Sequence, residues 1–184
     1  MASLDEVFEQ VERANFMTPE YRHLAEIDEA MPIGHGQTIS QPYTVRKMLE
    51  WLDVRPGQKV LDVGSGSGWS SALLAKLVGP KGRVYAVERV PELLDFGRAN
   101  VERAGARNVE FQPAGDELGL PAAAPFDRIL VSAAADKLPK ELLAQLEPGG
   151  KMVIPVHNDI LEISQTKADT EIKKHPGFVF VPLI

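Results

Sequence analysis

The chain has 184 residues, 44% hydrophobic and 25% charged, values typical of one globular domain and not of a disordered or fibrous protein. Its 20 basic and 26 acidic residues give a formal charge of −6, which disfavours the broad basic surface of a nucleic-acid-binding protein. The chain has no cysteine, which excludes disulfides, thiolate nucleophiles and cysteine-bound zinc and fits a reducing compartment.

The first forty residues are predicted to form short helices separated by loops. Apolar side chains recur at helical spacing near the N-terminus, at Leu4, Val7, Phe8 and Val11. A second helix start is predicted at 18–20, and a further helix over 41–52, opened by Pro42. The sequence has neither a secretory leader pattern nor a run of about 18 apolar residues, so we expect a cytoplasmic protein without a membrane span.

The rest of the chain alternates predicted strands and helices. The strands are predicted at 59–63, 83–88, 108–113, 126–134 and 151–156, and the helices at 70–78, 91–105 and 139–150. Near-continuous apolar strands linked by helices are typical of a parallel sheet covered on both faces. The tail instead alternates apolar and polar residues over 160–167 and 170–184, which favours antiparallel strands. We therefore predict one doubly wound α/β domain.

A glycine-rich loop follows the first predicted core strand, in the sequence VLDVGSGSGWSS. Gly64, Gly66 and Gly68 allow the backbone to approach a ligand closely. Their G-x-G-x-G spacing matches neither the dinucleotide-binding G-x-G-x-x-G motif nor a phosphate-binding P-loop. Asp62 can face a cationic ligand, and Glu88, at the end of the second strand, can accept hydrogen bonds from both hydroxyls of a ribose.

A third acid, Asp116, follows the third strand and is placed to accept a hydrogen bond from an adenine amino group. Three acids at three strand ends suit S-adenosylmethionine, which carries an ammonium, a sulfonium and a ribose but no phosphate. The alternative is that each glycine only forms a tight turn and each acid is a solvated strand end or helix cap.

The segment IGHGQTISQP, residues 33–42, is unusually polar and flexible for a position between two amphipathic stretches. Gly34 and Gly36 would let it fold over a cofactor, and Thr38 and Ser40 would present hydroxyls to the cleft. The alternative is a capped loop between helices. His35 receives no catalytic role, and because the histidines show no paired spacing on one element we expect no metal site.

The chain resembles the protein-L-isoaspartate O-methyltransferase family over nearly its whole length. The resemblance rests on FMTPEYR, MPIGHGQTISQPY, VLDVGSGSGW, VYAVERVPELL, FDRILVSAAADKLP, LEPGGKMVIPV and FVFVPL, of which GQTISQP and FVPL are the most family-specific. It implies a Rossmann-like, mostly parallel sheet. It also implies methyl transfer from S-adenosylmethionine, leaving S-adenosylhomocysteine, to the α-carboxylate of L-isoaspartyl residues in damaged proteins and peptides. The methyl ester then collapses through a succinimide, which repairs the protein.

The resemblance also implies roles for individual residues. Ser40 corresponds to the family's active-site residue. The residues implied to bind the cofactor or line its cleft are Gln37, Thr38, Ile39, Ser40, Asp62, Gly64, Gly66, Gly68, Glu88, Asp116 and Glu117. Residues 1–52 would be a helical preface and active-site cover, and 53–184 the cofactor-binding core with the C-terminal strands. The chain departs from the family pattern at Trp69, at Tyr43 and at Glu117, where a glycine is usual.

The implied chemistry needs few catalytic groups. A carboxylate acceptor with a pKa of about 4 is already ionised near neutrality, so no general base is required. Positioning alone can supply roughly 7–11 kcal/mol in favourable cases. We expect a monomer whose partners are isoaspartyl-containing proteins and peptides, without nucleic acid. Two alternatives are a methyltransferase acting on tRNA or a small molecule, and a non-catalytic cofactor-binding relative.

Overall fold

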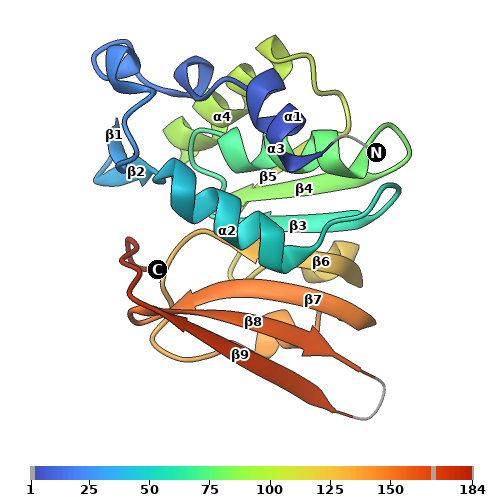
Figure 1. The fold of residues 1–184 in the computed structure, drawn as a ribbon. Coiled ribbons are helices and arrows are strands. Elements are labelled where there is room, and N and C mark those ends of the chain that lie inside the picture. The colour runs from blue at the N-terminus through green and yellow to red at the C-terminus, as the bar shows by residue number, and fades with distance from the viewer. Residues whose placement is uncertain (1–2, 167–168, 184) are drawn as a thin grey trace.

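The computed structural model describes residues 3–166 and 169–183, in which helices flank a central sheet (Figure 1). Seven described strands form this sheet, in the order β5-β4-β3-β6-β7-β8-β9. They are β3 (Lys59–Val63), β4 (Arg83–Glu88), β5 (Val109–Pro113), β6 (Phe126–Val131), β7 (Leu146–Val156), β8 (Asp159–Gln165) and β9 (Thr170–Pro176). The pairings among β3 to β7 are parallel, whereas β8 and β9 are added antiparallel. The prediction of a mostly parallel sheet with antiparallel C-terminal strands is confirmed.

The described helices are α1 (Leu4–Gln10), α2 (Pro42–Leu52), α3 (Trp69–Val78), α4 (Pro91–Arg103) and α5 (Lys140–Leu143), with short 3-10 turns η1 (Arg13–Phe16), η2 (Arg22–Leu24) and η3 (Pro121–Ala123). Helices α2, α3 and α4 contact the strands of the sheet, whereas α1 packs on α3. Pro42 begins α2, where a missing N–H costs nothing. The buried residues that follow, including Val45, Met48 and Leu52, lie on one face, and the helix ends at Asp53 in the left-handed region, with φ 51°.

Two buried clusters cover the two faces of the sheet. Successive residues of a strand point to opposite faces, so Val60 joins the cluster beneath α2 and α3, and Leu61 joins the one near α5. Both residues are fully buried, which explains why the parallel strands are apolar without interruption.

The order of the strands fixes the place of a ligand site. The chain runs from β3 outward through β4 to β5, then returns to place β6 on the other side of β3. A crevice therefore opens at the carboxyl ends of β3 and β6, the switch point where open α/β sheets bind their ligands.

The N-terminal region corrects part of the prediction. Residues 18–20 begin only a turn, which leads into the three-residue η2, and residues 31–39 form a hairpin of β1 (Met31–Gly34) and β2 (Gln37–Ile39) rather than a loop. Buried Met31 and Ile33 alternate with exposed neighbours in β1, a period-two pattern that the adjoining glycines obscure. The hairpin turn carries positive φ at Gly34, His35 and Gly36.

The C-terminal half also departs from the prediction. The helix expected over 139–150 is only the four-residue α5, and β7 begins at Leu146 and runs through Pro148. Pro148 could not continue a helix, because it lacks the helical N–H and disfavours helix in the residue before it. The chain leaves the helix earlier still, because Leu146 pairs with Phe126 of β6. The strand expected over 170–184 ends at Pro176. The following segment returns to the sheet, where Leu183 N–H donates to the Ala134 carbonyl at 2.8 Å. Lys167 and Ile184 lie outside the described residues.

Candidate active site

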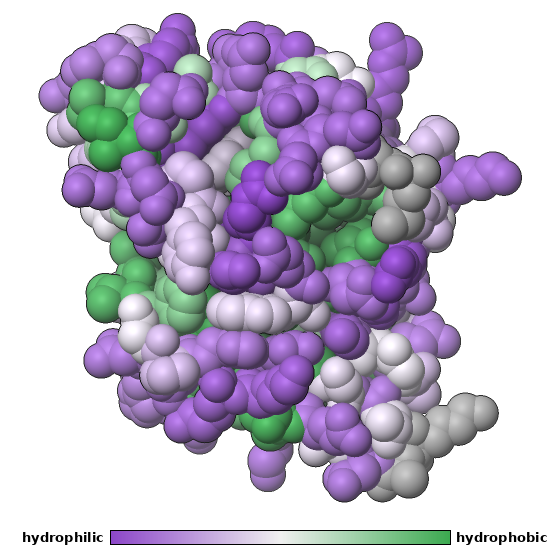
Figure 2. Space-filling model, in the orientation of Figure 1, coloured by the Kyte–Doolittle hydropathy of each residue, from purple (hydrophilic) through white to green (hydrophobic). Residues whose placement is uncertain are grey.

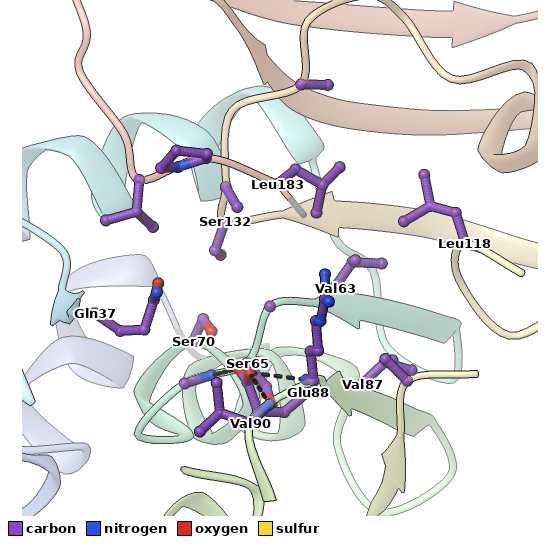
Figure 3. Close-up of a pocket in the computed structure, with 18 of the residues that line it drawn as sticks. Gln37, Val63, Ser65, Ser70, Val87, Glu88, Val90, Leu118, Ser132 and Leu183 are labelled. Carbon is purple, nitrogen blue, oxygen red and sulfur yellow. Dashed lines mark hydrogen bonds between the residues drawn. The ribbon is translucent and has the colours of Figure 1, made fainter. Parts of the chain in front are cut away.

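A cavity of about 900 Å³ lies at the carboxyl ends of β3, β4 and β6, a volume within the usual range for small-molecule sites. Most of its walls come from six parts of the chain: the hairpin and Ser40, the glycine loop, the end of β4, the loop after β5, the loop after β6, and the C-terminal segment. Figure 3 shows Gln37, Glu88, Ser132 and Leu183, from four different parts of the chain, around this space. The visible molecular face in Figure 2 is mostly hydrophilic, with apolar residues in separate patches.

The glycine loop is held to the sheet by its own backbone. The N–H groups of Gly64 and Ser65 both donate to the Val87 carbonyl, at 2.9 and 3.1 Å. Gly64 and Gly66 line the cavity with φ of 77° and 49°, a region that side chains disfavour. A Cβ on Gly66 would lie 3.3 Å from Cδ1 of Ile33, so the hairpin packs directly on this loop.

Glu88 connects the loop to the end of β4. Its Oε2 accepts the Gly66 N–H at 2.8 Å, and its Oε1 accepts the N–H groups of Arg89 and Val90 at 2.8 and 2.9 Å. These bonds occupy three of the roughly four lone-pair positions of a carboxylate. Glu88 lines the cavity as expected, but in this geometry it retains room for about one further hydrogen bond rather than one from each ribose hydroxyl.

Asp62 is not placed to face a ligand, contrary to the expectation from sequence. It is fully buried beneath the loop and absent from the cavity lining, and its Oδ2 accepts the hydroxyls of Ser70 and Ser71 at 2.7 and 2.6 Å. Burial raises the pKa of Asp62 to about 6, the two serine hydrogen bonds act against this rise, and the charge of Glu88 adds to it. In this structure Asp62 anchors the first turn of α3.

Gly68 also lies outside the cavity lining. A Cβ there would be 2.8 Å from the Gly97 carbonyl oxygen and 2.9 Å from Cγ2 of Val101. Its φ is 83°. This glycine is therefore required for the close packing of α3 on α4, and the structure gives it no direct contact with the cavity.

Asp116 and Glu117 lie on the cavity rim, in the exposed loop after β5. The far end of this loop is tied down by Gln145, whose side chain accepts from the Leu120 N–H and donates to the Leu118 carbonyl, each at 2.8 Å. The structure thus brings both acids to the same cavity as Glu88.

The cover of the cavity combines two distant parts of the chain. All four predicted residues of the hairpin region lie in the lining: Gln37, Thr38, Ile39 and Ser40. The C-terminal segment joins them through Val181 and Leu183, which pair with Ala134 after β6. Of the two aromatic departures, Trp69 is buried and also lines the cavity, whereas Tyr43 is half-exposed.

Several lining residues received no role from the sequence, namely Ser65, Ser132, Asp136, Lys137, Val181 and Leu183. The segments VSAAADKLP and FVPL contain most of them, but no spacing indicates that these segments meet. Ser65 has a buried hydroxyl without a hydrogen-bond partner.

Within the described part of the chain, no cluster of three or more histidine, aspartate or glutamate side chains is arranged to hold a metal ion. No helix among the described residues is long and apolar enough to cross a membrane.

Comparisons with known proteins identify the family of this chain. The family model for protein-L-isoaspartate(D-aspartate) O-methyltransferase matches residues 2–184. A protein-L-isoaspartate O-methyltransferase of Aeropyrum pernix is 52% identical over 185 residues, covering 97% of this chain and 71% of that protein. A solved protein-L-isoaspartate O-methyltransferase superimposes with a TM-score of 0.89 at 26% identity, over 98% of this chain and 60% of that one.

A second solved structure adds a ligand. It is a protein-L-isoaspartate O-methyltransferase of Plasmodium falciparum in complex with S-adenosyl-L-homocysteine. It superimposes with a TM-score of 0.86 at 26% identity, over 98% of this chain and 89% of that one. With a family model matching nearly every residue, the chain belongs to the protein-L-isoaspartate O-methyltransferase family.

Proposed function

We infer that this chain is an S-adenosylmethionine-dependent protein-L-isoaspartate O-methyltransferase, which methylates the α-carboxylate of L-isoaspartyl residues and so begins their repair. The observation that carries this inference is the meeting of two family segments in one cavity. Ser40 of the GQTISQP segment and Glu88 beyond the glycine loop line the same space, although 47 intervening residues separate them in sequence.

The residues present fit the cofactor. The cavity offers a glycine-lined floor, spare acceptor capacity on Glu88, and the Ser65 hydroxyl, which is buried without a partner. We propose that Gly64, Gly66 and Glu88 hold the nucleoside and that Asp116 and Glu117 lie beside its adenine. S-adenosylmethionine supplies the electrophilic methyl group when bound.

For the acceptor side, we propose that Ser40 donates its hydroxyl to the substrate carboxylate and orients one oxygen toward the methyl donor, with Gln37 and Thr38 beside it. No histidine lines the cavity among the described residues. A general base is not needed, because the acceptor is already ionised near neutral pH. The hairpin and the C-terminal segment together keep water from the reacting groups, which strengthens the electrostatic attraction between carboxylate and sulfonium.

Asp62 acts indirectly in this proposal. Its carboxyl group fixes the first turn of α3 through Ser70 and Ser71 and so holds the glycine loop in shape. The cytoplasmic location and the monomeric state remain predictions from the sequence.

The direct test is methyl transfer from labelled S-adenosylmethionine to paired peptides that differ only in L-isoaspartate or L-aspartate at one position. Labelling of the isoaspartyl peptide alone is the expected result. Equal labelling of both peptides, or preferential labelling of tRNA or a small molecule, would contradict the repair activity. Binding of S-adenosylhomocysteine without any transfer would indicate a non-catalytic relative.

A further inference from the structure

Arg13, in η1, is a buried arginine at the centre of the N-terminal region, with 6% of its surface exposed. Its guanidinium donates to three carbonyls of the loop between η2 and β1, those of Ala25, Ile27 and Glu29, at 3.1, 3.2 and 2.6 Å. One side chain therefore fixes a loop that has no regular secondary structure of its own.

The same guanidinium reaches the cover of the cavity. Nη2 donates to the Ser40 carbonyl at 3.2 Å and, at the longer distance of 3.5 Å, to that of Ile39. Ser40 is the residue to which the proposed function assigns the substrate contact. Arg13 thus binds the carbonyls of the two peptide bonds that flank this residue.

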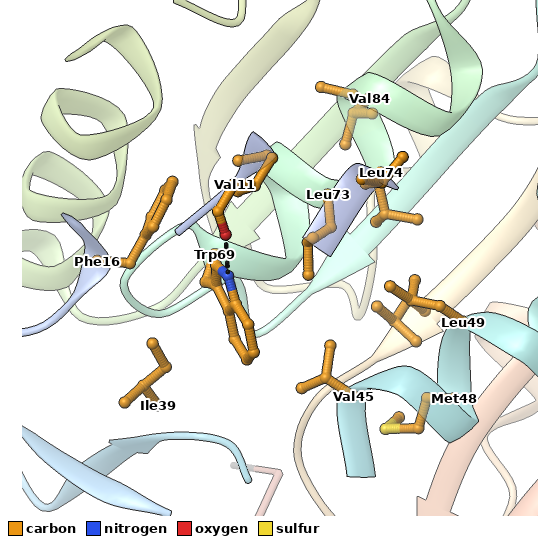
Figure 4. Packing of buried hydrophobic residues seen from close by; sticks show 14 of the residues in the cluster. Val11, Phe16, Ile39, Val45, Met48, Leu49, Trp69, Leu73, Leu74 and Val84 are labelled. Carbon is orange, nitrogen blue, oxygen red and sulfur yellow. Dashed lines mark hydrogen bonds between the residues drawn. The ribbon is translucent and has the colours of Figure 1, made fainter. Parts of the chain in front are cut away.

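Arg13 also contacts the cofactor side of the cavity. Its Cζ lies 5.6 Å from the ring centre of Trp69, the first residue of α3. The indole N–H of Trp69 donates to the Val11 carbonyl at 3.1 Å, drawn in Figure 4, with Ile39 nearby in the same buried cluster. Trp69 lines the cavity directly after the glycine loop. The guanidinium therefore lies between the cover and the glycine loop.

Burial of this cation is unfavourable by itself. Desolvation lowers the pKa of Arg13, and the charges of Asp28 and Glu26 partly offset this effect. Its polar partners are backbone carbonyls, and Nε has no hydrogen-bond partner. A methionine or leucine could fill such a space without the desolvation cost, so the arginine is better explained by what it holds.

The loop that Arg13 holds also forms hydrogen bonds, at the protein surface, with the residues that follow Ser40. The Asp28 carboxylate accepts the Tyr43 N–H at 2.8 Å, which caps the start of α2. The Gln41 side-chain amide donates to the Asp28 backbone carbonyl and carboxylate at 3.0 and 3.1 Å. The loop 25–29 is therefore joined to the segment 39–43 in two places. Arg13 bridges the two on the buried side, and Asp28 accepts hydrogen bonds from Gln41 and Tyr43 on the exposed side.

We propose that Arg13 is a positioning residue for methyl transfer, which holds the backbone of Ile39 and Ser40 so that the Ser40 hydroxyl faces the acceptor carboxylate. The proposal rests on the function proposed above. Lysine cannot replace this side chain, because a single ammonium cannot span carbonyls that a planar guanidinium reaches along two edges.

The test compares Arg13→Lys with the matched control Arg128→Lys. Arg128 is a second buried arginine, 8% exposed, which donates to the carbonyls of Asp53 and Asp127 and does not line the cavity. For Arg13→Lys we expect kcat on the isoaspartyl peptide to fall about tenfold or more, with the Kd of S-adenosylhomocysteine changed by less than about threefold. For Arg128→Lys we expect kcat to stay within about twofold of that of the parent protein. Both variants are assayed well below their melting temperatures.

Hydrogen exchange provides a readout that does not depend on activity. Backbone amides of residues 37–40 should exchange about tenfold faster in Arg13→Lys and unchanged in Arg128→Lys. Unchanged kcat and exchange in Arg13→Lys, or equal losses in the two variants, would overturn the proposal. If the parent protein methylates no isoaspartyl peptide, the proposed function fails, whereas the exchange result still reports on the contact between Arg13 and the cover.

A milder variant keeps the test valid should Arg13→Lys fail to fold. Asp28→Ala removes the two hydrogen bonds that the exposed carboxylate accepts from the Tyr43 N–H and the Gln41 side chain, keeps the one to the backbone carbonyl, and leaves the buried core intact. We expect a fall in kcat of about threefold, with faster exchange of residues 37–43. If neither kcat nor the exchange rate changed, the hydrogen bonds between Asp28 and the segment 41–43 would not position the cover.

Discussion

The two halves of the active-site cavity are built in different ways. In the cofactor half, backbone N–H groups of the glycine loop donate to the Val87 carbonyl, and the Glu88 carboxylate accepts the Gly66 N–H. The cover half combines residues 37–40 with 181–183, and the backbone of Ile39 and Ser40 is held by the buried side chain of Arg13, which belongs to neither segment. Substitutions in the cofactor half should therefore reduce stability or cofactor affinity, whereas those in the cover should reduce turnover.

The largest effect is expected at the base of the cofactor half. Gly68→Ala combines a left-handed backbone with contacts below 3 Å, so the free energy of unfolding should fall by roughly 2–5 kcal/mol. Gly36→Ala in the hairpin is the control, because its φ is +70° but nothing lies within 4 Å of the added Cβ, and about 1–2 kcal/mol is expected. Urea denaturation measures both. Equal losses would show that the packing of α3 on α4 does not require glycine at position 68.

Buried Asp62 predicts a pH-dependent stability. Because its pKa is raised from 3.8 to about 6 in the folded state, the folded protein binds this proton more tightly than the unfolded chain. The resulting stability is present below the unfolded pKa and is lost as the pH rises through about 6. Asp62→Asn cannot titrate, so the stability of the parent protein relative to this variant should fall by about 2 kcal/mol between about pH 4 and about pH 7. A constant difference in urea denaturation would contradict the raised pKa.

The loss of Glu88 should chiefly affect cofactor binding. Glu88→Ala removes the clamp on Gly66 and the spare acceptor, and the Kd of S-adenosylhomocysteine should rise about 10- to 100-fold in calorimetry. Glu92→Ala is the matched control, since Glu92 is an exposed acid in the first turn of α4, outside the cavity lining. Equal affinities for the two variants would exclude the role proposed for Glu88.

The smallest effect tests the cover half. Ser40→Ala should lower kcat about tenfold, the loss expected for one hydrogen bond to the acceptor, with cofactor affinity and stability nearly unchanged. Ser164→Ala, on β8 away from the cavity, serves as the control. A Ser40→Ala variant that loses cofactor affinity instead of turnover would place Ser40 in the cofactor half and remove the contrast between the two.

The sequence-based predictions are more accurate for the elements of the cofactor half than for the hairpin of the cover half. The strand at 59–63, the strand at 83–88 and the helices after them agree with the structure to within about two residues, because their apolar periodicity and their glycine or proline boundaries are local. The hairpin at 31–39 and the short α5 were mispredicted. The hairpin pairs only with itself, and its two short strands adjoin glycines that obscure their period-two pattern. The segment after α5 instead pairs with the distant strand β6, which overrides its local helical pattern.

The amino-acid sequence by itself determined the fold class, the glycine loop and the family, because hydrophobic periodicity and motif spacing are properties of contiguous residues. Only the tertiary structure decided that Asp62 is buried beneath the loop, that residues 181–183 close the cavity, and that Arg13 binds the Ser40 carbonyl. These features depend on which distant segments meet and on which side chains lose water when they do. Neither the spacing nor the composition of the chain records this information.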